Sequence, residues 1–464
     1  MARSARTGVP AWATTWLRRQ GYRPGNVMDP HVARWWSWFD CSADFYKAAA
    51  TVAGDTDEHM TLHPARAVCD EWSSLLLNES TALSSDDSGM AEWLGERMGP
   101  VLGDSADFVA RCFALGSGAW SLDFSGDGSG VVARVRIHDA CSVVPLAGEG
   151  RGSASCAFVS RVEAAGEEYD QVQVHEPDPA TGGTYHVRTW LFPARSHAAP
   201  VAVEGVVGDL DTRSELPTYA ICRPAIANTY EDNTPLGVSV FDDAVDSMKA
   251  VDEAFDTFYW SLRLGHPSVF LDERSLIRDE RGRVLGSDSV AQRLFRALDG
   301  PISDRLPVTF YNPDLRVQQA VDAVNLALSL MSWKCGLGPG YFSFDMHQGL
   351  KTATEVVADN APLARNIRRH EKVLGDALVR LARGAWAAER GISTGAQVRD
   401  ADVPRVEVQW DDSVIEDEAS ERATMKDDIA RGLAPAWIYP VRYYGMGEEE
   451  ARALTSGAGF PEEM

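Results

Sequence analysis

The strongest pattern in the chain is a stripe of apolar residues at helical spacing that follows Pro235. Its members are Val238, Phe241, Val245, Met248, Val251, Phe255, Phe258 and Leu262. A second stripe, from Val317 to Met331, follows Asn312 and Pro313, which suit an N-cap and a first helical turn. Steps of three and four residues place side chains on one helix face, so the sequence predicts two amphipathic helices.

The segments around these helices have different textures. Residues 263–312 between them are mixed in polarity, with a strand-like SVFL at 268–271. Residues 336–351 (GLGPGYFSFDMHQGLK) are rich in glycine and aromatic residues, which predicts a loop. Thr352 and Glu355 then form a capping box, so a long helix is expected from 352 to about 392.

The remaining segments combine helical and strand-like patterns. The first hundred residues favour helices, whereas alternation and turns between 116 and 210 favour strands. We expect strands at 131–137, 171–174, 185–192 and 406–410, turns at 125–130 and 177–183, and late helices at 413–431 and 448–454. This order predicts an α+β fold and excludes a doubly wound enzyme fold.

Composition narrows the class of protein. The chain has 464 residues, of which 45% are hydrophobic, so it can bury a substantial core. Its longest uncharged helical run, from Ala323 to Trp333, is far shorter than the roughly 20 residues of a membrane span. The N-terminus is a poor signal peptide, and the seven scattered cysteines suggest a reducing compartment. We therefore expect a soluble protein without a membrane partner.

Charge limits any contact with nucleic acid. The net charge of −24 would repel phosphate over most of the surface, so DNA contacts must be local or weak. The faces of the first predicted helix beside its apolar stripe are acidic. Their charged residues are Asp242, Asp243, Asp246, Asp252, Glu253 and Asp256, with Lys249 as the base. Such a helix is usually a solvated face, but several copies around a pore would line it with negative potential.

A basic cluster contrasts with this acidity. Its members Arg365, Arg368, Arg369 and Lys372 fall on one face of the predicted long helix. This face could pair with acidic neighbours, in this chain or in the next subunit, or it could contact DNA directly.

Candidate catalytic motifs are weak. His59 and His63 have the spacing of zinc ligands, but neither a glutamate between them nor a third ligand is evident. Asp209 and Asp211 form an isolated DxD pair. The glycines at 126–130 and the segment 349–352 lack the strand and helix context of phosphate-binding loops. The sequence therefore predicts no catalytic residue, no metal and no cofactor.

Several motifs in series resemble the portal, or head-to-tail connector, proteins of tailed bacteriophages, in the branch common in phages of Gram-positive hosts. The most specific is KCGLGPGYFSFDMHQGLKTATEVVADN at 334–360. Others are LHPARAVCDEWSSLLLNE (62–79), ALGSGAW (114–120), PLGVSVFDDAVDSMKAVDEAFDTFYW (235–260) and WIYPVRYYGMGEEEA (437–451). They cover nearly the whole chain in the family's order.

The resemblance implies a portal-type ring subunit with long stem helices, a β-containing wing and clip, and a long helix after the tunnel loop. The implied divisions are wing 1–236, stem helix 237–262, clip 263–312, stem helix 313–335, tunnel loop 336–351, crown-directed helix 352–392 and a C-terminal wing strand with short helices at 393–464. The chain ends soon after Leu454, so any crown helices would be short or absent.

The implied function is structural: a ring, usually of twelve subunits, at one capsid vertex, through which double-stranded DNA is packaged and ejected. Implied partners are the terminase motor, the scaffold and major capsid proteins, and a neck or tail adaptor. The ring would be part of the virion and assemble in the host cytoplasm. The tunnel loop would supply weak DNA contacts from Tyr341, Phe342, Phe344, Asp345, His347 and Lys351. The acidic stem face would consist of Asp242, Asp246, Asp252, Glu253 and Asp256.

Two other classes remain open at this stage. One is a minor capsid or other ring-forming virion protein without a DNA channel. The other is a metal-dependent nuclease or hydrolase that uses scattered acids, which would cleave DNA only with divalent ions.

Overall fold

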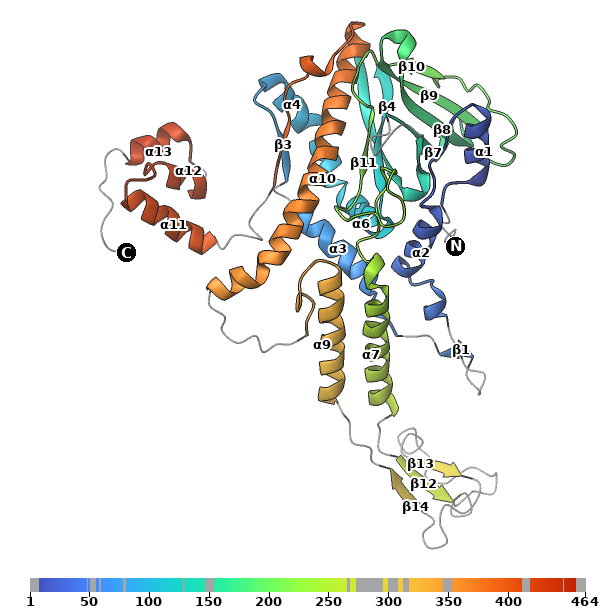
Figure 1. The fold of residues 1–464 in the computed structure, drawn as a ribbon, viewed down its shortest axis with the longest axis vertical. Coiled ribbons are helices and arrows are strands. Elements are labelled where there is room, and N and C mark those ends of the chain that lie inside the picture. Colours follow the sequence, from blue (N-terminus) through green and yellow to red (C-terminus); the bar gives the residue numbers. More distant parts are fainter. Residues whose placement is uncertain are drawn as a thin grey trace.

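The computed structural model confirms the predicted α+β fold. It describes residues 8–47, 49–50, 56–57, 60–77, 81–127, 130–146, 154–264, 268–272, 295–298, 308–311, 317–344, 353–410, 418–444 and 446–455. A body of helices and sheets carries two long helices, which extend to a small distal sheet (Figure 1). Within the described ranges, every helix is too short or too polar to span a bilayer.

The N-terminal part of the body is mainly helical, as predicted. Its helices are α1 (Ala11–Arg19), α2 (Asp29–Phe39), α3 (Pro64–Leu76), α4 (Ser88–Arg97), α5 (Gly99–Gly103) and α6 (Ala106–Leu115). Between them lie a short 3-10 helix, η1 (Asp44–Tyr46), and the short strands β1 (Ala49–Ala50), β2 (Thr56–Asp57) and β3 (Ala82–Ser84). α6 ends at Gly116, where φ is +76° and a Cβ atom would lie only 2.8 Å from the backbone of Val238.

Two antiparallel sheets form the β-rich part of the body. One has the order β11-β4-β5, built from β4 (Gly118–Asp127), β5 (Gly130–Asp139) and β11 (Tyr219–Cys222). Asp127 pairs with Gly130, which confirms the predicted hairpin turn. The other has the order β10-β9-β8-β7-β6, with bounds Val143–Leu146 (β6), Ser155–Ala164 (β7), Glu167–Asp178 (β8), Thr184–Pro193 (β9) and Asp209–Asp211 (β10).

The two predicted amphipathic helices are present, with one shifted boundary. After a 3-10 turn, η4 (Asp242–Ala244), the helix α7 spans Val245–Leu264, so it begins later than the predicted start near 237. α9 spans Val317–Lys334. The distal sheet has the order β13-β12-β14, with strands Ser268–Asp272 (β12), Phe295–Leu298 (β13) and Val308–Tyr311 (β14).

The helix α10 (Ala353–Thr394) crosses the whole body and confirms the predicted long helix. It packs against β11 and β5. Cβ atoms added at its Gly384 and Gly391 would lie within 2.5 Å of the carbonyl oxygens of Pro217 and Thr212. These glycines therefore let α10 approach the backbone of the 212–217 segment closely.

The chain then returns to the body and continues into a small helical unit. η6 (Asp400–Asp402) precedes β15 (Glu407–Gln409), which pairs antiparallel with β3. The late helices are α11 (Glu418–Ala430), α12 (Ile438–Tyr444) and α13 (Glu448–Thr455). In Figure 1 this unit lies beside the lower half of α10, away from the sheets.

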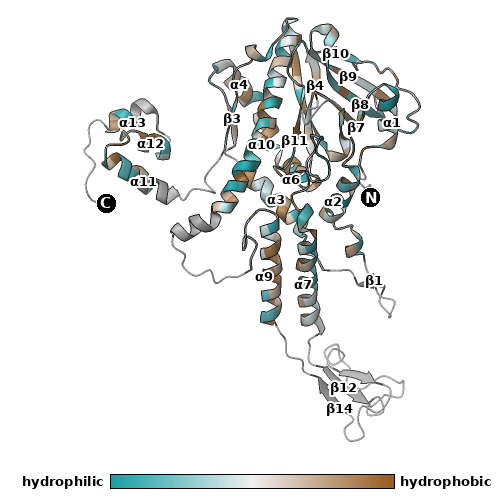
Figure 2. Ribbon diagram, in the orientation of Figure 1, coloured by the Kyte–Doolittle hydropathy of each residue, from teal (hydrophilic) through white to brown (hydrophobic). Residues whose placement is uncertain are grey.

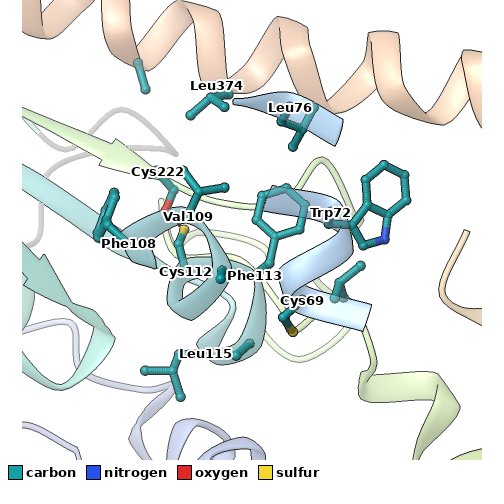
Figure 3. Packing of buried hydrophobic residues seen from close by; sticks show 14 of the residues in the cluster. Cys69, Trp72, Leu76, Phe108, Val109, Cys112, Phe113, Leu115, Cys222 and Leu374 are labelled. Atoms are coloured by element: carbon teal, nitrogen blue, oxygen red, sulfur yellow. Dashed lines mark hydrogen bonds between the residues drawn. The ribbon is translucent and has the colours of Figure 1, made fainter. Parts of the chain in front are cut away.

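The main hydrophobic core lies where α3, α6 and α10 meet. Trp72 and Leu76 from α3 approach Phe113 of α6 and Leu374 of α10 (Figure 3). The apolar faces of α7 and α9 join the same core at its lower edge. The body, the first turns of α7 and the last turns of α9 are therefore packed as one unit.

Candidate functional site

The helix pair α7 and α9 is the most distinctive candidate region. The two helices pack side by side and antiparallel, because the chain leaves the body along α7 and returns along α9 (Figure 1). Met248 and Val251 of α7, and Met331 of α9, are buried near the body. Towards the distal sheet the burial decreases, and Leu262 is already exposed. The predicted apolar stripe of α7 is thus buried only in its half nearest the body.

α9 carries a second apolar face that is not covered. Leu326, Leu330 and Trp333 follow one another at heptad spacing and are 63%, 49% and 62% exposed. Successive residues are rotated by about 100° around a helix, so this row lies roughly opposite the buried Val324 and Met331. Figure 2 shows α9 as apolar along most of its length. We call these three residues the α9 outer stripe.

Asp242, predicted to belong to an exposed acidic face, is buried instead. Its carboxylate accepts hydrogen bonds of 2.7 Å from Trp35 Nε1 and from the Tyr230 hydroxyl, and Arg34 lies 3.8 Å away. The prediction that Asp242 is exposed is therefore wrong, because its carboxylate oxygens bind Trp35 of α2 and Tyr230.

Asp252 is a second correction, since it is fully buried. It accepts hydrogen bonds from the Tyr46 hydroxyl, the Thr61 hydroxyl and the Leu62 amide, each 2.9 Å long. Burial raises the pKa of Asp252, while these donors act in the opposite direction. Burial and the nearby carboxylate also raise the pKa of Tyr46. Asp252 thus attaches the N-terminal segment to α7 and cannot line an open surface.

The remaining predicted acids differ in their surroundings. Asp256 Oδ1 accepts a hydrogen bond of 3.1 Å from the Met60 amide, so it extends the attachment made by Asp252. Glu253 and Asp246 are exposed, as is Asp243. Asp246 lies 3.2 Å from Lys249 in an exposed pair. We call Asp243, Asp246 and Glu253 the α7 acidic face.

The loop after α9 folds back onto that helix in its described part. The Gly340 and Phe342 amides donate to the hydroxyls of Ser329 and Ser332, at 3.1 and 3.3 Å. The Phe344 amide donates to Asn325 Oδ1 at 2.9 Å. Residues 340–344 therefore lie against one polar row of α9.

Side chains at the base of this loop are anchored in the body. The Tyr341 hydroxyl donates to a carboxylate oxygen of Glu71, and Phe342 packs against the main core. Burial is the largest cause of the raised pKa of Tyr341. Phe344 is exposed, whereas the predicted contact residues Asp345, His347 and Lys351 lie outside the described residues. Tyr341 and Phe342 are thus anchors in this structure, contrary to their predicted place in a projecting loop.

The predicted basic face lies on the lower half of α10. Arg365, Arg368, Arg369 and Lys372 are all exposed. None of the four forms an ion pair with a residue that the structure describes. Pairing within the described chain therefore does not account for these cations, and we call them the α10 basic face.

Buried polar contacts hold this part of α10 in place. Asn366 Nδ2 donates to the Gly336 carbonyl at 2.7 Å, and the Ala225 amide donates to His370 Nδ1 at 3.0 Å. The His370 ring packs against Trp72, with ring centroids 4.6 Å apart. Burial lowers the pKa of His370 to about 3, so the imidazole is neutral and accepts the amide hydrogen.

The described candidates for metal binding have other partners. Asp209 lies 2.8 Å from His186 and 3.2 Å from Arg188, and Asp211 lies 3.1 Å from Arg213. His63 Nδ1 lies 3.0 Å from Cys41 Sγ, while His59 is outside the described residues. The described residues contain no cluster of three or more metal-ligating side chains.

Sequence reasoning missed the residues that hold the loop. Asn325, Ser329 and Ser332 form a polar row at steps of four and three inside an otherwise apolar helix. That spacing is a readable signal for a segment lying along α9. Trp72, whose Nε1 donates to the Cys335 carbonyl at 3.1 Å, gave no such signal because a buried tryptophan usually indicates only a core.

Comparison with known proteins gave matches only among solved structures. The chain matches no known protein-family profile and no curated protein. It is similar to a chain in the neck of a native GTA particle computed with C12 symmetry, with 11% identity, a TM-score of 0.37, and coverage of 97% of this chain and 99% of that chain. A chain in the neck of an empty GTA particle computed with C6 symmetry has 11% identity, a TM-score of 0.33 and coverages of 88% and 90%. At this level of similarity, the function has to be inferred from the residues of the chain itself.

Proposed function

We propose that this chain is the subunit of a portal ring, through which double-stranded DNA enters and leaves a viral capsid. The observation that carries this proposal is the path of the chain between the body and the distal sheet. The helix pair leaves the body, bears a three-stranded sheet at its far end, and returns to a loop that leads into α10. This order matches the stem, clip, tunnel loop and crown-directed helix implied by the sequence motifs.

In this proposal each region has a mechanical role. The body, residues 1–236 and the region 393–464, forms the wing of the ring. The sheet in 263–312 forms the clip, which meets a neck or tail adaptor. The ring also docks the terminase motor and the scaffold and major capsid proteins at one vertex of the virion. ATP hydrolysis belongs to the motor, so the chain itself is structural.

Charge supports a channel that does not hold DNA tightly. A duplex is densely negative, and proteins that bind it firmly do so with lysine and arginine on phosphates. The net charge of −24, multiplied around a ring, would oppose such binding in every register. Because Asp242 and Asp252 are buried, this repulsion comes from the overall charge rather than from a five-carboxylate stem face.

The loop after α9 is the proposed contact with passing DNA. Its first part is fixed by Tyr341 and Phe342, so the contacts would come from Phe344 and from Asp345, His347 and Lys351 beyond it. Contacts from one short loop per subunit are weak individually, which suits a duplex that has to move.

Electron microscopy of the purified chain, with native mass measured on the same sample, tests the ring. We expect rings of about a dozen subunits around an open channel wide enough for a DNA duplex. An oligomer without such a channel would favour a minor capsid protein instead. Divalent-ion-dependent cleavage of DNA would favour a nuclease.

Replacement of residues 344–347 by Gly-Ser tests the loop in particles assembled with the variant chain. We expect less packaged DNA per particle, because the proposed contacts are lost. The same Gly-Ser replacement of residues 204–207 is the matched control, since these four residues are an exposed segment of the body away from the loop. Equal genome content in the 344–347 variant and in the control would contradict the loop proposal.

A further inference from the structure

The α10 basic face has no ion-pair partner among the residues that the structure describes. Arg365, Arg368, Arg369 and Lys372 place four positive charges on about two helical turns of a chain whose net charge is −24. All four are exposed, and no described carboxylate lies within ion-pair distance of them. A concentrated positive patch on an otherwise negative protein is suited to bind a negatively charged surface.

The α7 acidic face is the complementary surface. Asp243 in η4, and Asp246 and Glu253 in the first half of α7, are exposed where this helix leaves the body. Lys249 lies near Asp246, in an exposed pair of the kind that contributes little. The face therefore keeps most of its negative charge available.

Both faces lie at the same end of α9. Lys334, the last residue of α9, donates to the Asp243 carbonyl at 3.1 Å, which places the acidic face beside that end. Asn366 donates to the Gly336 carbonyl just beyond α9, which places the basic face there as well. In Figure 1, α7 and the lower half of α10 lie on opposite sides of α9. Among the described residues, the two faces of one copy form no ion pair with each other.

A ring of identical chains needs this arrangement. A closed ring is built from head-to-tail contacts, in which one surface of each copy meets a different surface of the next. We infer, on the basis of the proposed ring, that the α10 basic face of one copy docks on the α7 acidic face of the neighbouring copy. The partner is thus a second copy of this chain, and the contact repeats around the ring.

The α9 outer stripe belongs to the same contact. Trp333 is three residues before Gly336, whose carbonyl binds Asn366, so the stripe continues from the start of the basic face along α9. A neighbour seated on the basic face would also cover Leu326, Leu330 and Trp333. The charges would orient the two copies, while burial of large apolar side chains would supply most of the affinity.

Charge reversal tests the pairing. One variant carries Arg368→Glu and Arg369→Glu, and a second carries Asp243→Lys and Asp246→Lys. Each alone should weaken self-association at least tenfold, as measured by native mass over a concentration series. A mixture of the two should assemble again, because every contact then joins opposite charges.

Arg18→Glu with Arg19→Glu is the matched control. These adjacent exposed arginines on α1 undergo the same change of charge as the basic-face variant. The control should assemble like the unmodified chain. Unfolding temperature and circular dichroism of each variant show whether the fold is intact. Leu326→Ser with Leu330→Ser should also weaken association, because apolar burial is lost. The association that remains should be more sensitive to salt, since it rests on the charged contact and the screening length falls from about 10 Å at 0.1 M to about 3 Å at 1 M.

The possible outcomes separate this inference from the proposed function. Three results would overturn the docking. Both charge-reversed variants could assemble unchanged, or their mixture could fail to restore assembly. The unmodified chain could also be folded and yet stay monomeric at all concentrations. Loss of duplex binding with unchanged assembly in the basic-face variant would overturn it in favour of a DNA site. Rings that need the pairing but enclose no channel would support the docking and refute the portal function.

Discussion

α7 and α9 are neighbouring helices of similar length, but their outer faces differ. α7 presents Asp246, Glu253 and Thr257 to solvent, whereas α9 presents Leu326, Leu330 and Trp333. The outer face of α7 is polar enough to remain in water, and its inner carboxylates bind the N-terminal segment. A row of large exposed apolar residues, in contrast, is typical of a surface that another protein covers. Within one helix pair, the outer face of α7 is polar, whereas the outer face of α9 is a row of uncovered apolar side chains.

The largest expected effect distinguishes the two faces of α9. Met331→Ala should lower the free energy of unfolding by about 2–5 kcal/mol, because it leaves a cavity in the main core. Leu330→Ala, one residue earlier on the exposed face, should change it by less than about 0.5 kcal/mol. Denaturant unfolding under dilute conditions gives both values. Equal losses would show that the outer stripe is already packed in a single chain.

The next effect distinguishes two adjacent acids of α7. Asp252→Ala should cost about 2 kcal/mol or more, because the Tyr46 hydroxyl, the Thr61 hydroxyl and the Leu62 amide lose their acceptor. The exposed neighbour gives the control, since Glu253→Ala should cost less than about 0.5 kcal/mol. If both variants unfold at the same denaturant concentration, Asp252 does not attach the N-terminal segment.

Acid should destabilise the body through its buried histidines. Burial lowers the pKa of His138, His175 and His370 to about 3, against 6.5 for an ordinary histidine. The unfolded chain therefore binds protons first, so stability is lost as pH falls from about 6.5 towards 3. Each buried histidine should contribute about 1.4 kcal/mol per pH unit across that window.

His370→Gln tests this effect at one position. Glutamine can still accept the Ala225 amide hydrogen but does not titrate. Between pH 7 and pH 5 the variant should lose less stability than the unmodified chain, as measured by urea unfolding at each pH. The raised pKa of Asp252 acts in the opposite sense, because protonation then favours the folded state as pH falls. An unchanged pH slope in the variant would exclude a contribution of His370.

The smallest effect concerns the base of the loop. Tyr341→Phe should cost about 1 kcal/mol, because Glu71 loses a hydrogen-bond donor. Phe344→Ser, three residues later in the exposed part, should leave stability within about 0.5 kcal/mol. A larger loss for Phe344→Ser than for Tyr341→Phe would reverse the assignment of anchor and exposed segment.

Periodicity predicted most of the elements correctly. The stripes in 238–262 and 317–331, the alternation in 131–137, and the long helix expected from 352 to about 392 all correspond to elements of the right type. These patterns are local, so a single sequence contains them. The start of α7 was misplaced because Val238 and Phe241 are buried in an irregular segment, where apolar spacing alone mimics a helix.

The environment of the charged residues could not be predicted in this way. Asp252 and Glu253 are adjacent acids on one predicted helix, yet one is buried and the other exposed. The difference depends on a segment about 190 residues earlier, whose position no local pattern specifies. The same holds for Tyr341, which is anchored by Glu71 of α3.

The attachment of the N-terminal segment to α7 also has a temporal consequence. Trp35 and Tyr46 bind Asp242 and Asp252, which lie more than 200 positions later in the chain. At about 5–20 residues per second, a ribosome takes roughly 10–40 seconds to reach those carboxylates after it has made the tryptophan. During that interval Trp35 and Tyr46 lack the carboxylates that they bind in the folded chain, so this aromatic segment waits for its partners while the rest of the body is synthesised.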